Sequence, residues 1–370
     1  MKPWQQTLLI IASIILVGVL VYFFHSIFAY ILVAAIMGMI GRPVMELLDK
    51  VHIQRFYLPN AIKAIITLFV IYGGLFTLFL LLIPPIISRG QELSTISTNP
   101  GEFFKGLEAP LMQLEAFLKD KSLIPSDASL PNMIRETIIS FSQDVLDIGQ
   151  VSDAVKSLAG ATGGFFAALF SVTFISFFFL EDRGLFRRII LTITPDAYDE
   201  KMNNVLTNIR PLLTRYFVGV LLEVLLVGGL ISLGLFILGV EDALMIGFFA
   251  GCFNVIPYLG PIIGAVMGLL LTTLGGLHME FYSQLLPLLA KVAVVFAIVQ
   301  LIDNMVFQPL IYSSSVKAHP LEIFLVILMA GSIAGVGGMI LAIPTYTLIR
   351  VIAKEFFSEF KIVQSITKSI

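Results

Sequence analysis

Long apolar runs without a charged residue dominate the hydrophobic pattern of this chain. No Asp, Glu, Lys or Arg occurs in residues 3–41, 243–279 or 323–349. A helix needs about 20 apolar residues to cross the roughly 30 Å hydrocarbon core of a membrane, so each run is long enough to cross. The strands of a transmembrane barrel instead show short alternating patterns. The pattern therefore predicts an all-α polytopic membrane protein.

We expect about eight membrane segments in total. Six have the length of ordinary spans, near residues 5–24, 26–41, 62–83, 159–180, 216–238 and 285–308. Two further apolar blocks, 243–273 and 321–350, would each measure about 45 Å as straight helices, which is too long for one ordinary crossing. Helix-breaking residues interrupt both blocks, with Pro257 and Pro261 in the first and Gly335-Val336-Gly337-Gly338 in the second.

Two arrangements remain open for these interrupted blocks. Each is either one long tilted span or a re-entrant helical hairpin, which enters and leaves the membrane on the same side. Positive residues in short loops mark the cytoplasmic side. The loop 274–284 has no Lys or Arg and the loop 309–320 has only Lys317, a distribution that favours hairpins.

Glycine spacing predicts how the interrupted blocks pack. Small residues on one helix face let two backbones approach closely in lipid. Four-residue spacing occurs at Gly247 and Gly251, at Gly260, Gly264 and Gly268, and at Gly331 and Gly335. We therefore expect close helix packing at these positions, although glycine is also common in membrane helices in general.

Basic residues predict the orientation of the chain. Lys and Arg gather in segments 42–63 and 181–215 and in the tail that starts at Arg350. These segments share one side if both termini are cytoplasmic, and the segment 84–157 then lies outside. The expected domains are N-terminal spans 1–83, an external helical segment 84–157, a fourth span with a cytoplasmic amphipathic helix 158–215, a transport core 216–351 and a cytoplasmic tail 352–370.

Composition and motifs argue against several functions. Of the 370 residues, 58% are hydrophobic and only 13% are charged, about half the charged share of a soluble domain. The net charge of −2 argues against a nucleic-acid partner. Cys252 is the single cysteine, and no Walker, His-Glu-x-x-His or Gly-x-Ser-x-Gly motif occurs. We therefore expect neither an enzyme nor a metal or other cofactor, apart from H+ or Na+ as a coupling ion.

Ionisable residues at membrane depth are candidates for function because burying them in lipid is costly. Asp303 lies late in the span 285–308, and Glu223 lies a turn or two inside the span 216–238. Either carboxyl group can instead reach the membrane surface or form a structural hydrogen bond. We predict that these two residues carry ion coupling.

Interrupted helices supply the second set of candidates. Their free backbone groups must be shielded by protein or line a watery cavity, and transporters place substrate sites at such breaks. Proline-kinked spans without any site are the alternative interpretation. The candidate substrate-binding residues are Asn254, Pro257, Tyr258, Gly260, Pro261, Gln300, Asn304, Pro309, Gly337, Gly338 and Pro344.

Four stretches of the sequence resemble the AI-2E family of bacterial transporters, the autoinducer-2 exporters and their relatives. They are Asn254-Val-Ile-Pro-Tyr-Leu-Gly-Pro-Ile-Ile-Gly264, Asp303-Asn-Met-Val-Phe-Gln-Pro309, His319-Pro320-Leu321 and Gly338-Met-Ile-Leu-Ala-Ile-Pro344. One departure is Val220, which follows Tyr216-Phe-Val-Gly219 where the family often carries Gln. The resemblance implies export of small solutes across a bacterial inner membrane by a homo-oligomer. It links some relatives to autoinducer-2 and others to sodium–proton exchange.

Residues and resemblance together leave three hypotheses. The first is a multi-pass inner-membrane secondary transporter that exports a small polar solute, such as an autoinducer-2-like quorum-sensing signal, by ion-coupled alternating access. The second is a sodium–proton antiporter. The third is a membrane scaffold whose external segment recruits partners. In the first hypothesis the partners are the lipid bilayer, the solute and further copies of the chain.

Overall fold

The computed structural model describes residues 22–50, 58–98, 162–276, 279–312 and 319–367, with isolated residues at 19 and between 112 and 136. These residues form helices joined by short turns and contain no strand, which confirms the all-α fold. Most of the expected span 5–24 and most of the predicted external segment 84–157 lie outside the described residues.

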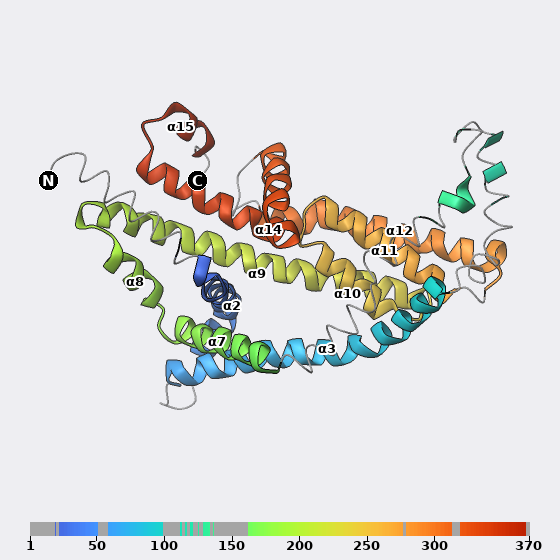
Figure 1. The fold of residues 1–370 in the computed structure, drawn as a ribbon, viewed down its shortest axis with the longest axis horizontal. Helices are drawn as coiled ribbons and strands as arrows, with labels where there is room; N and C mark the ends of the chain where they lie inside the picture. Colours follow the sequence, from blue (N-terminus) through green and yellow to red (C-terminus); the bar gives the residue numbers. More distant parts are fainter. Residues whose placement is uncertain are drawn as a thin grey trace. The chain divides into compact units, whose positions relative to one another are not determined.

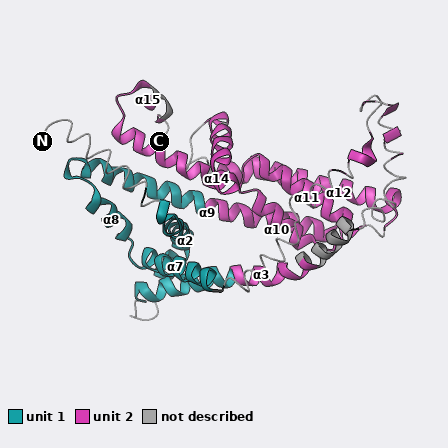
Figure 2. Ribbon diagram, viewed as in Figure 1, with its two compact units in different colours: residues 1–74, 161–217 teal, residues 75–160, 218–370 magenta. Residues whose placement is uncertain are grey.

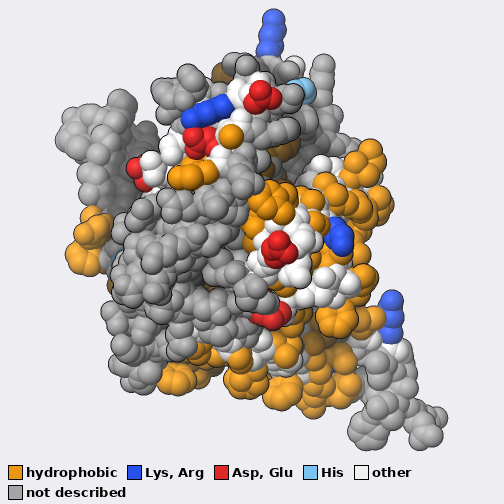
Figure 3. All heavy atoms as spheres, turned by 90° about the vertical axis from the view of Figure 1, so that its right-hand side faces the viewer, with side chains coloured by type: hydrophobic (Ala, Val, Ile, Leu, Met, Phe, Trp, Pro, Cys, Tyr) orange, Lys and Arg blue, Asp and Glu red, His pale blue; other side chains and the backbone are white. Residues whose placement is uncertain are grey.

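Six helices in the described part of the chain are long and apolar enough to cross a membrane. They are His25–Lys50, Asn60–Pro84, Gly163–Glu181, Asp196–Ile237, Phe281–Leu310 and Leu321–Phe356. Large hydrophobic side chains stay exposed on them, including Phe69 at 78% and Ile333 at 84%. Such side chains cover much of the described surface in Figure 3. Extensive exposed apolar surface marks contact with lipid or a partner, so the chain is a multi-pass membrane protein in contact with the bilayer.

The chain divides into two compact units, which Figure 2 colours separately: residues 1–74 with 161–217, and residues 75–160 with 218–370. In the first unit, α2 (His25–Lys50) and α7 (Thr162–Glu181) lie side by side (Figure 1). The Ser176 hydroxyl donates to the Ala34 carbonyl at 3.5 Å, and a Cβ on Gly38 would lie 3.3 Å from that of Phe179. The two pairs have nearly the same sequence offset, so α2 and α7 run parallel.

Two helices differ in length from the sequence prediction. Helix α3 (Asn60–Thr98) has 39 residues and continues beyond residue 83, where the predicted span ends. Helix α9 (Asp199–Ile237) also has 39 residues and contains Pro211. The backbone of α9 therefore runs unbroken across the predicted boundary at residue 216 between an amphipathic helix and a span, and the division into two compact units falls close to it, between Phe217 and Val218. An internal proline removes one N–H donor, but here the helix continues past it.

A short helix that the sequence prediction did not single out joins α7 to α9. Helix α8 (Leu185–Ile193) is amphipathic and precedes the 3-10 turn η1 (Asp196–Tyr198). At its start, the guanidinium of Arg188 donates to Asp182 and lowers the pKa of that carboxyl, as does the Gly184 N–H at 3.0 Å. The Asp182 side chain thus stabilises the turn between α7 and α8.

The first interrupted block forms a helical hairpin in the second unit. Helices α10 (Ala243–Phe253) and α11 (Leu259–Gly275) lie side by side. A Cβ on Gly260 would collide with the Phe253 carbonyl oxygen, and one on Gly264 would lie 3.1 Å from the Ala250 Cα. The contact partners thus advance along α11 while they go back along α10, so the two helices run antiparallel and the chain reverses between them. The glycine spacing therefore serves close packing, as predicted.

The second interrupted block also reverses direction. Helix α14 (Pro320–Phe356) has non-helical backbone at Ala334 and Gly335. The Tyr346 hydroxyl donates to Glu322 Oε2 at 3.0 Å, although residues this far apart in one straight helix would be separated by about 36 Å. Gly335 has a positive φ of 59° and open space around its Cβ position, so it forms the turn and is not a packing residue. That part of the glycine prediction is wrong.

A shared hydrophobic core holds the second unit together. It joins the second half of α9 to α10, α11 and α12 (Leu286–Ile302). A Cβ on Gly251 would lie 2.5 Å from the Val224 carbonyl oxygen and one on Gly268 would lie 2.5 Å from the Phe296 ring, so glycine allows both close approaches. Further described helical elements are the π-helical segments η2 (Phe281–Leu285) and η3 (Asp303–Phe307), and the short helices α13 (Gln308–Tyr312) and α15 (Lys361–Thr367).

Candidate functional site

Four polar side chains meet inside the second unit, and we call them the carboxyl cluster. Glu223 comes from α9, Asn254 from the C-terminal end of α10, Asp303 from the end of α12 and Gln308 from the start of α13. Glu223 and Asn254 are each 3% exposed and Asp303 is fully buried at 0%. Residues 85 positions apart in sequence thus share one interior site.

Amide groups hold the two carboxyl groups in place. Asn254 Nδ2 donates to Glu223 Oε1 at 3.1 Å and to Asp303 Oδ2 at 3.3 Å. Gln308 Nε2 donates to the same Asp303 Oδ2 at 2.8 Å. One amide nitrogen, at the end of α10, therefore links a carboxyl group of α9 to one at the end of α12.

Asp303 Oδ1 is buried and accepts no hydrogen bond within the described residues. An unsatisfied buried acceptor is expensive, and an unpaired buried charge more so. Among the described residues Asp303 also forms no ion pair. Within the described part of the chain, the cluster therefore offers one oxygen that can accept a proton or a small cation.

Irregular backbone lies next to two members of the cluster, Asn254 and Asp303. Helix α10 ends at Phe253, and Tyr258 in the following break has a positive φ of 69°. A bulky residue in this region is strained and persists when the surrounding structure requires it. Asp303 begins a π-helical segment, η3 (Asp303–Phe307). Such segments are rare and frequent at functional sites, and this one is not visible in the hydrophobic pattern.

The structure brings only some of the predicted residues together. Gln300 and Asn304 bond each other at 3.1 Å on an exposed face and do not bond to the cluster. Tyr258 is 47% exposed and its ring lies 6.1 Å from that of Phe324. Pro309 and Gly337 are exposed, Pro257 and Pro261 are half-buried, Gly260 and Gly338 pack against backbone carbonyls, and Pro344 is buried in an arm of α14.

Gln308 is the cluster member that sequence reasoning missed. It lies inside the Asp303–Pro309 stretch quoted above, immediately before Pro309. Its position five residues after Asp303 would place it off the Asp303 face of a regular α-helix, whereas the π-helical segment brings the two side chains into contact.

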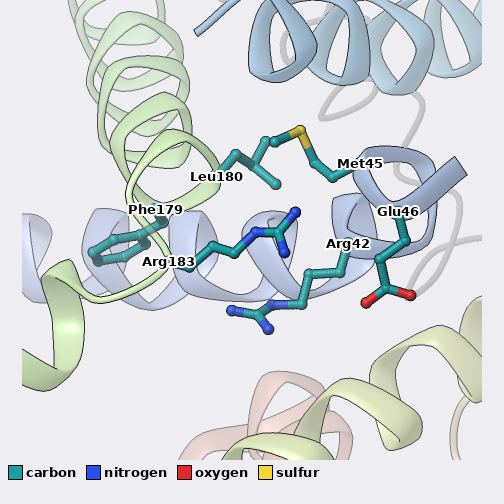
Figure 4. A pocket seen from close by; sticks show the side chains of 6 residues that line it. All are labelled: Arg42, Met45, Glu46, Phe179, Leu180 and Arg183. Carbon is teal, nitrogen blue, oxygen red and sulfur yellow. The ribbon is translucent and has the colours of Figure 1, made fainter. Parts of the chain in front are cut away.

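Two pockets of the described residues lie away from the cluster. One in the second unit includes Gly239, Asp242 and Gly276. The other, in the first unit, lies between α2 and α7 and is shown in Figure 4. Neither pocket is lined by a member of the carboxyl cluster.

Comparison with known proteins relates this chain to membrane transport proteins. The chain is 27% identical to YueF of Bacillus subtilis strain 168, provisionally named a transport protein, over 89% of this chain and 84% of that one. It is 25% identical to PerM of Escherichia coli strain K12, provisionally named a permease, over 90% of this chain and 88% of that one. Residues 9–358 match the family described as AI-2E family transporter. The protein therefore belongs to the AI-2E transporter family and has a role in membrane transport.

Proposed function

We propose that this protein is a secondary transporter that moves a small polar solute by alternating access, with the carboxyl cluster as its proton-binding site. The observation that carries the proposal is the burial of Glu223 and Asp303 around the single Asn254 amide. A site that binds and releases a charge inside a membrane protein is what ion coupling requires.

Electrostatics favours one shared proton in this cluster. Two buried carboxylates that accept from the same nitrogen repel each other, and desolvation makes each charge costly. A proton on one of them removes the repulsion and the desolvation penalty of that carboxylate. Asp303 Oδ1, which has no hydrogen-bond partner among the described residues, is the position that can take it.

The two hairpins suit a solute path that opens and closes. Helix α10 has 11 residues and measures about 16 Å, too short to cross the bilayer. We infer that both hairpins are re-entrant. Ile256 near the tip of the first packs with Ile327 and Ala342 of the second. In this proposal the solute binds near the breaks, at the predicted substrate-binding residues around Asn254, Tyr258 and Gly337.

The chemical class of the solute follows from the resemblance. Relatives of this family are linked to autoinducer-2, and export of a similarly small polar signal from the cytoplasm is the transport that we propose. The neutral side-chain amide of Asn254 matches a hydroxyl-rich solute, because an amide both donates and accepts hydrogen bonds.

Transport in proteoliposomes tests the role of Asp303. We expect Asp303→Asn to lower proton-driven transport of autoinducer-2 by at least roughly tenfold, since a tenfold change corresponds to about 1.4 kcal/mol and one charged hydrogen bond contributes at least that much. The matched control is Glu241→Gln, which removes an exposed acid of the same unit. Unchanged rate and unchanged proton dependence in Asp303→Asn would remove Asp303 from the mechanism.

Sodium–proton exchange is a second candidate, because carboxylate oxygens can also bind Na+, and Asp303 Oδ1 accepts no hydrogen bond from the described residues. A pH-sensitive dye inside the proteoliposomes distinguishes the two. Alkalinisation or acidification driven by added Na+ without any organic solute supports exchange, and a requirement for the solute supports solute transport.

A further inference from the structure

A pocket in the first unit lies where two membrane helices end. Arg42, Met45 and Glu46 come from the last turns of α2, and Phe179, Leu180 and Arg183 come from the end of α7 and the residues after it. Helix α7 has 20 residues and measures about 30 Å, the thickness of a hydrocarbon core, and Arg183 lies beyond its last residue. We therefore expect the pocket to lie near the level of the lipid headgroups.

Basic side chains dominate the polar part of this pocket. Figure 4 shows the guanidinium groups of Arg42 and Arg183 reaching toward one another, while the Glu46 carboxylate turns away from both. Like charges that face each other are stabilised by an anion that contacts both. Two planar guanidinium groups match the oxygens of a phosphate group in particular.

The neighbouring ion pairs leave donors available. Asp49 accepts from Arg183 and from Lys63 Nζ, the latter at 2.6 Å, so one carboxylate serves two cations. Arg183 has five N–H donors, more than this pair uses. Arg42 makes no hydrogen bond or ion pair with the described part of the chain. The basic side chains in or beside the pocket are Arg42, Arg183 and Lys63. They outnumber the acidic side chains there, Glu46 and Asp49.

Apolar surface beside the pocket points to a ligand with hydrocarbon chains. Met45 and Leu180 form a buried wall. Leu47, Phe178 and Phe186 remain exposed on the same helices and on α8. An anion that sits between two membrane helices with apolar surface beside it is better matched by a lipid than by a free ion.

We propose that this pocket binds the phosphate group of an anionic phospholipid, with Arg42 and Arg183 as its ligands. The phosphodiester accepts from both guanidinium groups, and the acyl chains lie against the exposed side chains of α2 and α7. The proposal is independent of the transported solute, because it uses residues of the first unit alone.

Lipid binding to the purified full-length chain tests this proposal. Native mass spectrometry counts bound lipid in detergent micelles with phosphatidylglycerol, with phosphatidylcholine, or with phosphatidylglycerol and inorganic phosphate together. We expect selective binding of phosphatidylglycerol and about tenfold weaker binding to Arg42→Gln, the loss expected when one charge-assisted contact is removed. Arg187→Gln is the matched control, because Arg187 lies outside the pocket and donates to Asn203 at 2.8 Å.

Three outcomes would overturn the proposal. Equal binding of phosphatidylcholine would remove the requirement for a net negative charge. Equal losses in Arg42→Gln and Arg187→Gln would show a general charge effect. Phosphate that displaces phosphatidylglycerol at equal concentration would identify a site for free phosphate. Unchanged thermal unfolding of Arg42→Gln shows that a loss of binding is not a loss of folding.

Discussion

Asn254 shows how a single residue can acquire a role that its type does not reveal. As an amide beside a helix break, it is a natural candidate for binding a solute, and the sequence analysis predicts that role. In the structure its Nδ2 donates to both Glu223 and Asp303. Any solute contact must therefore compete with, or use, this bridge between the two acids.

Removal of the bridge should destabilise the protein. We expect Asn254→Ala to lower the free energy of unfolding by about 1–3 kcal/mol, because two buried acceptors lose a donor. Asn203→Ala is the control, since Asn203 makes its hydrogen bond to Arg187 on an exposed face. Thermal unfolding in detergent measures both variants. Equal changes in the two would contradict a structural role for the bridge.

At the scale of elements, glycine decides how closely the helices of the second unit approach. Gly251 faces the Val224 carbonyl oxygen, and Gly260 faces that of Phe253. Both glycines lie in buried positions. By contrast, Gly229 on α9 has no atom within 4 Å of its Cβ position. The same residue type thus has different consequences along neighbouring helices.

Gly260→Ala should loosen the first hairpin. A Cβ there collides with a backbone oxygen that cannot move without shifting α10, and overpacking of this kind costs about 1–3 kcal/mol. Gly229→Ala should change stability by no more than about 1 kcal/mol and in the favourable direction, because alanine is the better helix former. Melting temperatures in one detergent compare the two. If the Gly260→Ala protein were as stable as the Gly229→Ala protein, α10 and α11 could not be packed as closely at Gly260 as the structure shows.

At the scale of the whole molecule, the reversals of the chain at both breaks are compatible with re-entrant hairpins, one of the two arrangements left open by the sequence. Because the chain reverses between α10 and α11, Glu241, which precedes the hairpin, and Glu280, which follows it, lie toward the same end of the hairpin. If the hairpin is re-entrant, both ends lie outside the cell. We expect the tail after α14 to lie inside, because basic residues mark the cytoplasmic side.

Cysteine labelling tests this topology in intact cells. In a Cys252→Ser background, we expect a membrane-impermeant maleimide to label Glu241→Cys and Glu280→Cys from outside. Lys354→Cys should react only after permeabilisation. All three positions are exposed. Label on Glu241→Cys but not on Glu280→Cys would mean that the block crosses the membrane once.

The sequence by itself determined the all-α membrane class, the two interrupted blocks and the selection of Glu223 and Asp303 as candidate residues. These depend on the lengths of apolar runs and on local helix breakers, which are readable without neighbours. It also determined family membership, through short stretches such as Asp303–Pro309 that the comparisons support.

Only the tertiary structure decided which polar groups meet. The π-helical segment after Asp303 turns Gln308 toward the cluster, and the end of α10 brings Asn254 between two acids far apart in sequence. Gln300 and Asn304, equally polar and close in sequence, face away and bond each other. The rotation of a helix and the direction of a hairpin depend on contacts with other helices, so the spacing of residues along one chain could not determine them.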